Sequence, residues 1–129
     1  MSTRRPLDAI PYARYLGVEV EDGPDGPICV LPFRDDLVGN PSLPALHGGV
    51  VGAFLELTAL VHLIRVGEGD RVPKPINFSI DYLRSPGRAE TRGRAEIVKH
   101  GRRIANVRVI AWQTATDKPV AAGIGNFLL

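Results

Sequence analysis

The amino-acid sequence predicts an α+β fold in which one long central helix is wrapped by a curved antiparallel β-sheet. Two observations lead to this fold class: a long apolar stretch near the middle of the chain, and a succession of alternating apolar and polar segments after it. A helix that is apolar on every side must be enclosed by other elements, and antiparallel strands can supply that enclosure. The chain has 129 residues with neither a repeat nor a linker, so we expect residues 1–129 to form one domain.

The segment before the central helix is predicted to hold a short helix and two strands. Residues 7–16 have a helical rhythm that ends at Gly17, and glycine is typical of helix C-termini. Strands are expected at 18–20 and 28–33, with a turn-rich segment between them. Residues 34–46 carry polar residues and prolines, and we expect them to form a loop that leads to the helix.

The central helix is expected over about residues 47–66, with Gly67 and Gly69 as the residues that end it. Glu56 is the only acid in this stretch, and its neighbours are almost all apolar. An ionised carboxylate in such surroundings must be paired, neutralised or used, because uncompensated burial of a charge is costly. Glu56 is therefore the strongest indication of chemistry in the chain.

Strands are expected throughout the remainder of the chain. Residues 76–82 alternate between apolar and polar side chains, which is the period-two pattern of a half-buried strand. Further strands are expected at 89–98, at 103–115 and in a last segment that ends at Leu128, with turns at 85–88, 99–102 and 116–119. The result is one helix followed by consecutive antiparallel strands.

Composition narrows the classes of function. The net charge of +2 is too small to indicate a nucleic-acid-binding protein. The single cysteine, Cys29, excludes an internal disulfide and fits a reducing cytoplasm, and its apolar neighbours favour a buried structural residue over a nucleophile. No signal peptide is recognised, and Glu56 and His62 interrupt the apolar stretch, which argues against a membrane span. We expect a cytoplasmic protein without membrane or nucleic-acid partners.

The start of the predicted helix suits the stabilisation of a negatively charged oxygen. A helix N-terminus offers free N–H groups and a positive dipole end, and glycine lets a ligand approach the backbone closely. Gly48 has these properties; the alternative is that Gly48 and Gly49 only allow close packing or a tight turn. His47 is more often a helix-start or hydrogen-bonding residue than a catalytic base, although both roles remain open.

Glu56 also has two interpretations. Its apolar setting raises the pKa of the carboxyl towards neutrality, which suits a general base. The alternative is a core acid that a buried arginine or backbone donors satisfy. Gly48 and Glu56 are eight residues apart, which is about 12 Å along a helix, whereas groups that act on one carbonyl must reach atoms only about 3 Å apart. Two antiparallel copies of the helix could bring them together, so we expect an obligate homodimer with two shared sites.

The sequence resembles the PaaI-like branch of the hotdog-fold acyl-CoA thioesterases over nearly its full length. The features that carry the resemblance are Asn40, His47-Gly48-Gly49, an acid nine residues after the histidine, and the segment Ile80-Asp81-Tyr82-Leu83-Arg84. The resemblance implies a hotdog fold, a dimer whose two sheets join, often a dimer of dimers, and hydrolysis of an acyl-CoA thioester. It also implies that the Gly48 N–H polarises the thioester carbonyl, that Glu56 acts as nucleophile or general base, and that Asn40 assists at the carbonyl.

The sequence departs from the family pattern at three prolines. Pro44 and Pro41 stand where members commonly have glycine and asparagine, with Asn40 one residue further out. Pro75 stands where some members have a serine or threonine that orients water, so either Asn77 or the backbone takes that role or the role is absent.

The remaining expectations concern the substrate. CoA carries phosphates, for which Arg84, Arg102 and Arg103 are candidate partners, although ordinary solvated strand ends explain them as well. Leu60 is expected near the acyl group. No cofactor or metal site is expected, since CoA is part of the substrate and the three histidines are scattered. The alternatives are a hotdog hydratase, which lacks support from an Asp-and-His pair, and a hotdog protein that binds a thioester without hydrolysing it.

Overall fold

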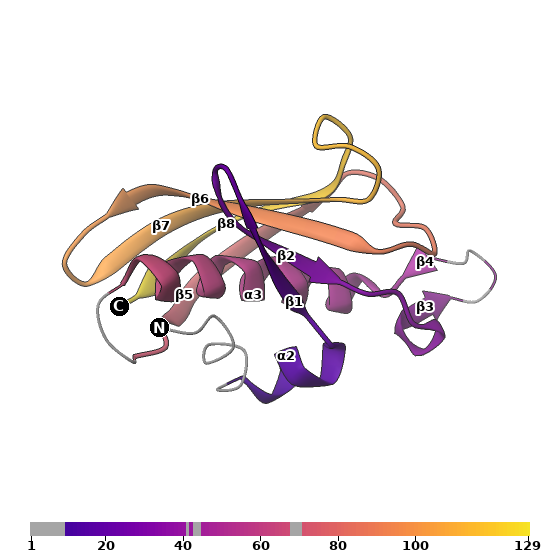
Figure 1. The fold of residues 1–129 in the computed structure, drawn as a ribbon, viewed down its shortest axis with the longest axis horizontal. Coiled ribbons are helices and arrows are strands. Elements are labelled where there is room, and N and C mark those ends of the chain that lie inside the picture. Colours follow the sequence, from indigo (N-terminus) through magenta and orange to yellow (C-terminus); the bar gives the residue numbers. More distant parts are fainter. Residues whose placement is uncertain (1–9, 41, 43–44, 68–70) are drawn as a thin grey trace.

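The long apolar segment forms a single helix, α3 (Gly48–Val66), that lies against the concave face of an antiparallel sheet (Figure 1). This computed structural model describes residues 10–40, 42, 45–67 and 71–129. By length and composition α3 could cross a membrane, but most of it is buried in the core of the protein itself. The helix begins and ends where the sequence predicts.

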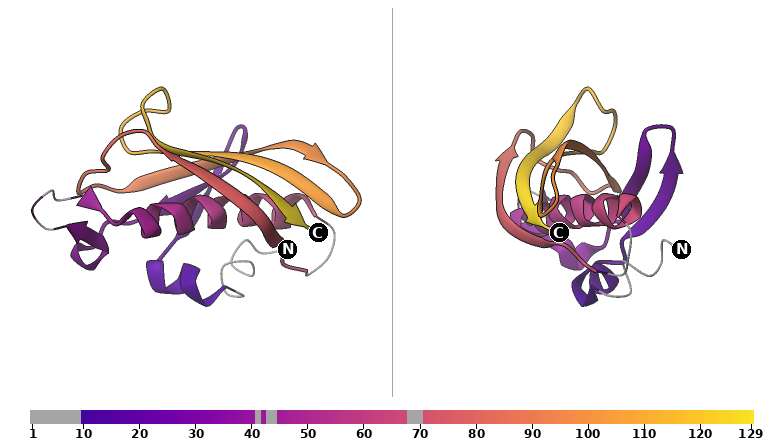
Figure 2. Two further views of the ribbon diagram at one scale, coloured as in Figure 1. Left: turned by 180° about the vertical axis from the view of Figure 1, so that it is seen from behind. Right: turned by 90° about the vertical axis from the view of Figure 1, so that its left-hand side faces the viewer.

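The sheet has six strands in the order β1-β2-β6-β7-β8-β5, and every neighbouring pair is antiparallel. The strands are β1 (Glu19–Gly23), β2 (Gly26–Leu31), β5 (Lys74–Tyr82), β6 (Thr91–His100), β7 (Ile104–Trp112) and β8 (Pro119–Leu128). The sheet curves around α3 when the molecule is seen from the end (Figure 2). This is the helix within a curved sheet that the sequence predicts, so the fold class is confirmed.

The core lies between α3 and the concave face of the sheet. On β7, Ala105, Val107 and Val109 are fully buried and face the helix, while Asn106 and Arg108 alternate with them and face outwards. On β6 the helix comes so close that a Cβ atom at Gly93 would lie 2.9 Å from the Phe54 ring. Glycine at this position therefore permits the contact between α3 and the centre of the sheet.

The segment before α3 is more regular than predicted. We expected residues 34–46 to form a loop, but they contain a short helix η1 (Asp35–Leu37) and the paired strands β3 (Val38–Asn40) and β4 (Ala45–Leu46). Leu37 and Leu46 are buried, and backbone groups that approach a core need hydrogen-bond partners. Strands of two or three residues are too short for their alternation to be recognised in the sequence.

The strand β5 does not lie beside β6, which follows it in the sequence. This strand pairs with β8 at the edge of the sheet, whereas β6 lies between β2 and β7. The connection around residues 85–88 therefore crosses to the other side of β7 and β8 and does not form a hairpin. Alternation of side chains shows which face of a strand is buried but not which strand lies beside it.

The first helix among the described residues is α2 (Pro11–Leu16), and the Gly17 that caps its end has a φ of 74°. The N–H of Gly17 donates to the carbonyls of Ala13 and Arg14. This left-handed conformation favours glycine, so the predicted helix end at Gly17 is confirmed. Residues 7–9 of the predicted helix lie outside the described residues.

Candidate active site

The start of α3 is fixed by His47, which is its N-cap residue. The N–H of Gly49 donates to Nδ1 of His47 at 2.9 Å. The backbone N–H of His47 donates to the carbonyl of Leu37 at 2.8 Å, and that of Leu46 donates to Pro86 at 3.2 Å. Because a backbone N–H can only donate, Nδ1 of His47 carries no proton, and the ring is the neutral tautomer with its proton on Nε2.

The N–H of Gly48 has no hydrogen-bond partner among the described residues. It belongs to the first turn of α3, where N–H groups lack partners within the helix and where the helix dipole is positive. A Cβ atom at Gly48 would lie 3.6 Å from the Tyr82 ring, which is ordinary contact, and its φ is not positive. Neither packing nor a tight turn in this chain therefore requires glycine at position 48.

Gly49 differs from Gly48 in this respect. A Cβ atom at Gly49 would lie 3.0 Å from Nδ1 and 3.2 Å from Cε1 of the capping His47 ring. Gly49 thus gives the imidazole room to cap the helix, whereas Gly48 leaves an N–H group open to a ligand.

Glu56 lies two turns further along α3, between the buried residues Leu55 and Leu57. Its side chain is half-buried, and burial raises the pKa of its carboxyl above the ordinary value. Within the described part of the chain, no ion pair or hydrogen bond holds this carboxylate. With Ala53 it forms a partly exposed stripe on the side of α3 that the sheet leaves uncovered. A carboxylate with these properties can accept a proton from water.

Tyr82, at the end of β5, was given no role from the sequence, but the structure places it at the start of α3. Its hydroxyl donates to the carbonyl of Gly48 at 2.8 Å. Its ring lies beside both Gly48 and Gly52. The alternation of β5 does place Tyr82 on the same face as Phe78 and Ile80, but only the pairing of β5 with β8 brings that face to the start of the helix.

Two other predicted residues, Asn77 and Leu60, lie apart from the groups at the start of α3, and the side chain of a third, Asn40, lies outside the described residues. Asn77 is on the opposite face of β5, where its side-chain oxygen accepts hydrogen bonds from the backbone and the side chain of Asn126, both at 3.2 Å. Leu60 is buried in the core, with 7% of its surface exposed. Asn40 ends β3 and pairs with Ala45 through the backbone, while its side chain, like Pro41 and Pro44, lies outside the described residues.

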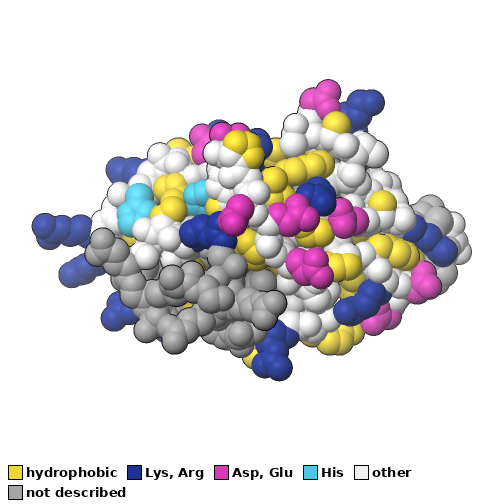
Figure 3. Space-filling view, viewed as in Figure 1, with side chains coloured by type: hydrophobic (Ala, Val, Ile, Leu, Met, Phe, Trp, Pro, Cys, Tyr) yellow, Lys and Arg dark blue, Asp and Glu magenta, His cyan; other side chains and the backbone are white. Residues whose placement is uncertain are grey.

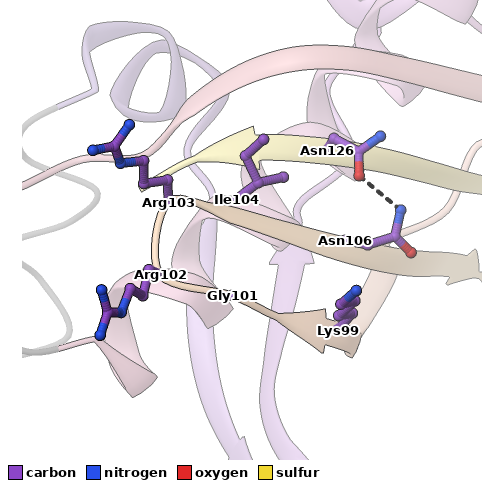
Figure 4. A pocket seen from close by; sticks show the side chains of 7 residues that line it. All are labelled: Lys99, Gly101, Arg102, Arg103, Ile104, Asn106 and Asn126. Carbon is purple, nitrogen blue, oxygen red and sulfur yellow. Dashed lines mark hydrogen bonds between the residues drawn. The ribbon is translucent and has the colours of Figure 1, made fainter.

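The predicted arginines lie at two ends of the molecule. Arg102 and Arg103 belong to the turn between β6 and β7, where with Lys99 they line a pocket of about 660 Å³ (Figure 4). Lys and Arg side chains gather at this end of the surface (Figure 3). Arg84 is at the other end of β8, and its guanidinium donates to the carbonyl of Pro119 at 2.9 Å.

This hairpin pocket opens on the outer face of the sheet. Asn106 and Asn126, which line it, alternate with buried residues that face α3, so their side chains point away from the helix. They are joined by a hydrogen bond of 3.0 Å (Figure 4). Three cationic side chains and two amides can hold an anionic group such as a phosphate.

Cys29 is buried and His62 is partly buried, and both lie outside the candidate site. Burial raises the pKa of the Cys29 thiol to about 11, so the thiol is inert and the structural interpretation is confirmed. His62 packs against Gly26, the first residue of β2, where a Cβ atom would lie 3.0 Å from the His62 ring. Burial, and then the charge of Arg65, lower the pKa of His62. Among the described residues, no three His, Cys, Asp or Glu side chains gather as a metal site.

A long helix enclosed by a curved antiparallel sheet is the hotdog fold, and the open amide and half-buried carboxylate on that helix are groups suited to acyl transfer. The sequence profile of the acyl-CoA thioesterase N-terminal domain matches residues 40–128, which is more than half of the chain. The chain therefore belongs to the acyl-CoA thioesterase domain family, as the resemblance predicted. None of the proteins with curated functions matches it.

Solved structures share the whole fold. A protein from Chromobacterium violaceum is 39% identical, with a TM-score of 0.77 over 95% of this chain and 85% of that one. A putative thioesterase from Ralstonia eutropha, described as phenylacetic acid degradation-related, is 22% identical, with a TM-score of 0.84 over 98% of both chains. A Bacillus halodurans protein whose structure was determined with CoA is 21% identical, with a TM-score of 0.77 over 97% of this chain and 88% of that one.

We expect His62 to lower the stability of the protein as the pH falls below about 6.5. Its pKa is lowered in the folded chain, so the unfolded chain binds a proton more readily and protonation favours unfolding. The free energy of unfolding should decrease from pH ~6.5 down to the folded-state pKa. Chemical denaturation across this range should show a smaller decrease in His62→Gln than in the wild type, while the exposed His100→Gln should match the wild type. Equal slopes in all three proteins would contradict the expectation.

Proposed function

We propose that this protein hydrolyses an acyl- or aryl-CoA thioester to the free acid and CoA. The observation that carries the proposal is the N–H of Gly48, which has no partner among the described residues, at the positive end of α3 and on the same helix as the half-buried Glu56. Membership of the acyl-CoA thioesterase family and the Bacillus halodurans structure with CoA support the same substrate class. We further propose that the protein acts in the cytoplasm and requires no cofactor.

In the proposed reaction, the thioester oxygen accepts a hydrogen bond from the Gly48 N–H, and Glu56 removes a proton from a water molecule. The water oxygen attacks the carbonyl carbon, and negative charge develops on the oxygen that Gly48 holds. When the tetrahedral intermediate collapses, the C–S bond breaks, the CoA sulfur leaves and takes up a proton, and the free acid remains. A carboxyl whose pKa is raised towards the working pH is a more effective base than an ordinary glutamate.

The proposed site is shared between two chains. Gly48 and Glu56 of one helix are separated by about 12 Å, so each needs its counterpart from a partner. The edge strand β5 is the proposed junction, because it has one neighbour, β8, and exposes the large apolar side chains Ile76 and Tyr82. On the uncovered stripe of α3, the small residue Ala53 beside Glu56 would allow a second helix to approach. Homodimers of this kind could pair further into a dimer of dimers.

The hairpin pocket is the proposed site for the phosphates of CoA. Its Lys99, Arg102 and Arg103 are cationic and exposed, and no ion pair to a described residue occupies them. Arg84 is the weaker candidate, because its guanidinium already donates to Pro119.

Gly48→Pro should lower kcat by about 10²–10³, the usual cost of removing one oxyanion donor. Proline fits the first position of a helix and removes only the N–H group, and His47 already has the extended conformation that a following proline requires (φ −61°, ψ 133°). Gly48→Ala is the matched control, because it retains the N–H and its Cβ meets only ordinary contacts. Thiol release from acyl-CoA measures both, and equal activity of the two variants would exclude the Gly48 N–H as the donor.

Glu56→Gln should lower kcat by orders of magnitude while substrate still binds, because the amide retains the shape of the side chain but cannot act as the base. A heterodimer of Glu56→Gln and Gly48→Pro chains contains one intact site of two and should regain about half of the wild-type activity. Differently tagged chains, expressed together and purified through both tags, provide that heterodimer.

If the heterodimer stayed inactive, the site would not be shared. Absence of thiol release by the wild type from a panel of acyl- and aryl-CoA thioesters, together with binding of those thioesters, would favour the non-catalytic alternative.

Reversing both charges in Arg102→Glu/Arg103→Glu should raise KM for acyl-CoA about tenfold or more, since a hydrogen bond to a charged group contributes about 1.5–3 kcal/mol, and should leave kcat nearly unchanged. The same variant should hydrolyse an acyl-pantetheine thioester, which lacks the nucleotide, as the wild type does. Arg88→Glu, at the other end of the sheet, is the control for charge alone. A KM that rises equally for both substrates would place the CoA phosphates elsewhere.

A further inference from the structure

The peptide group between Gly48 and Gly49 is held at both ends by side chains. Its carbonyl oxygen accepts the hydroxyl of Tyr82 at 2.8 Å. Its N–H donates to Nδ1 of His47 at 2.9 Å. A side chain of β5 and a side chain just before α3 therefore grip the same peptide group from opposite sides.

This grip acts at the first turn of α3, where two glycines follow each other. Two successive glycines have no side chains to limit their φ and ψ angles, so their peptide groups reorient more easily than those of other residues. The preceding peptide carries the Gly48 N–H, and among the described residues its hydrogen bonds lie on the carbonyl side, where the His47 oxygen accepts from Val50 at 3.0 Å and from Val51 at 3.2 Å. Reorientation of the Gly48–Gly49 peptide would move the Gly48 N–H through their shared Cα atom.

The packing of β5 on α3 is arranged around the Tyr82 hydroxyl. Gly52 lies inside the helix, where glycine is destabilising relative to alanine. A Cβ atom at Gly52 would lie 2.8 Å from Cδ1 of Ile80 and 3.3 Å from the Tyr82 hydroxyl oxygen. The absence of a side chain at position 52 thus allows the hydroxyl to reach the Gly48 carbonyl.

The two hydrogen bonds also form a chain through one peptide group. The Tyr82 hydroxyl polarises the Gly48 carbonyl, and this strengthens the Gly49 N–H as a donor to His47. The same bond keeps the proton of His47 on Nε2, so the ring can donate but cannot act as a base through Nδ1.

We propose that Tyr82 is a positioning residue whose hydroxyl, through the Gly48–Gly49 peptide, holds the Gly48 N–H and the His47 ring in the arrangement that polarises the thioester. The inference rests on the proposed thioesterase function. Tyr82, which belongs to β5, would keep the start of α3 ordered, although it contacts neither the attacking water nor Glu56 in the proposed reaction.

Tyr82→Phe removes the hydroxyl and retains the ring. We expect kcat for acyl-CoA to fall about tenfold, less than the loss expected for removal of a whole oxyanion donor, while KM stays within about twofold because the substrate contacts remain. Tyr12→Phe is the control, since Tyr12 is an exposed tyrosine of a different element, α2. Thermal unfolding of each variant should remain cooperative, with a midpoint close to that of the wild type, which separates positioning from loss of fold.

A second readout does not depend on activity. In Tyr82→Phe, hydrogen exchange of the Gly49 amide should become about tenfold faster, because its bond to His47 loses support, and the ¹⁵N signals of His47 should move away from those of a pure Nε2–H tautomer. Unchanged exchange and unchanged His47 signals would overturn the proposal. If the wild type is active, a kcat of Tyr82→Phe equal to that of the wild type would overturn it as well. If the wild type released no thiol from any thioester, the proposed function would fail, whereas the exchange and ¹⁵N measurements would still decide the role of Tyr82.

Discussion

The enclosure of α3 is the constraint on which the rest of this structure depends. The helix has no polar face wide enough to meet water, so most of its surface must be covered by its own sheet. The sheet achieves this by curvature and by glycines such as Gly93, which let α3 approach to van der Waals distance. The cover is incomplete along the side of Ala53 and Glu56 and at the first turn, and the candidate site lies in that uncovered region.

The chemistry of the site follows from the same incomplete cover. The first turn of any helix has unpaired N–H groups. Here the His47 ring accepts from one of them, at Gly49, while the preceding N–H, at Gly48, has no partner in the described part of the chain. The half-burial of Glu56 raises its pKa without surrounding it by protein on every side. An entirely enclosed helix would have left neither group accessible to a substrate. Covering this region with a second copy of α3 would both complete the enclosure and bring the two kinds of group together.

Features that depend on neighbouring residues could be predicted from the sequence. The apolar run and flanking glycines determine α3, and the unusual setting of Glu56 and Gly48 identified both as candidates. Features that depend on pairing between distant strands could not. Tyr82 meets Gly48 only because β5 lies at the edge of the sheet beside β8. Arg84 and Arg102 are far apart because Arg84 lies at the start of β8, beside Pro119, and Arg102 lies near its end, beside Asn126. For Asn77, the alternation of its own strand already placed it on the outer face, although the departure of Pro75 from the family pattern had suggested Asn77 as a substitute for the residue that orients water.

The position of Asn77 has a consequence for how β5 finds its place. A strand that slips by two residues keeps the same face towards the core, so burial of apolar side chains alone does not distinguish the two alignments. Asn77, Asn126 and Asn106 stand side by side on three adjacent strands, and their amides hydrogen-bond in a row across the outer face. A slipped strand would break that row. Hydrogen bonds on the outer face therefore fix the register of β5, and that register determines which of its side chains on the inner face reaches the start of the helix.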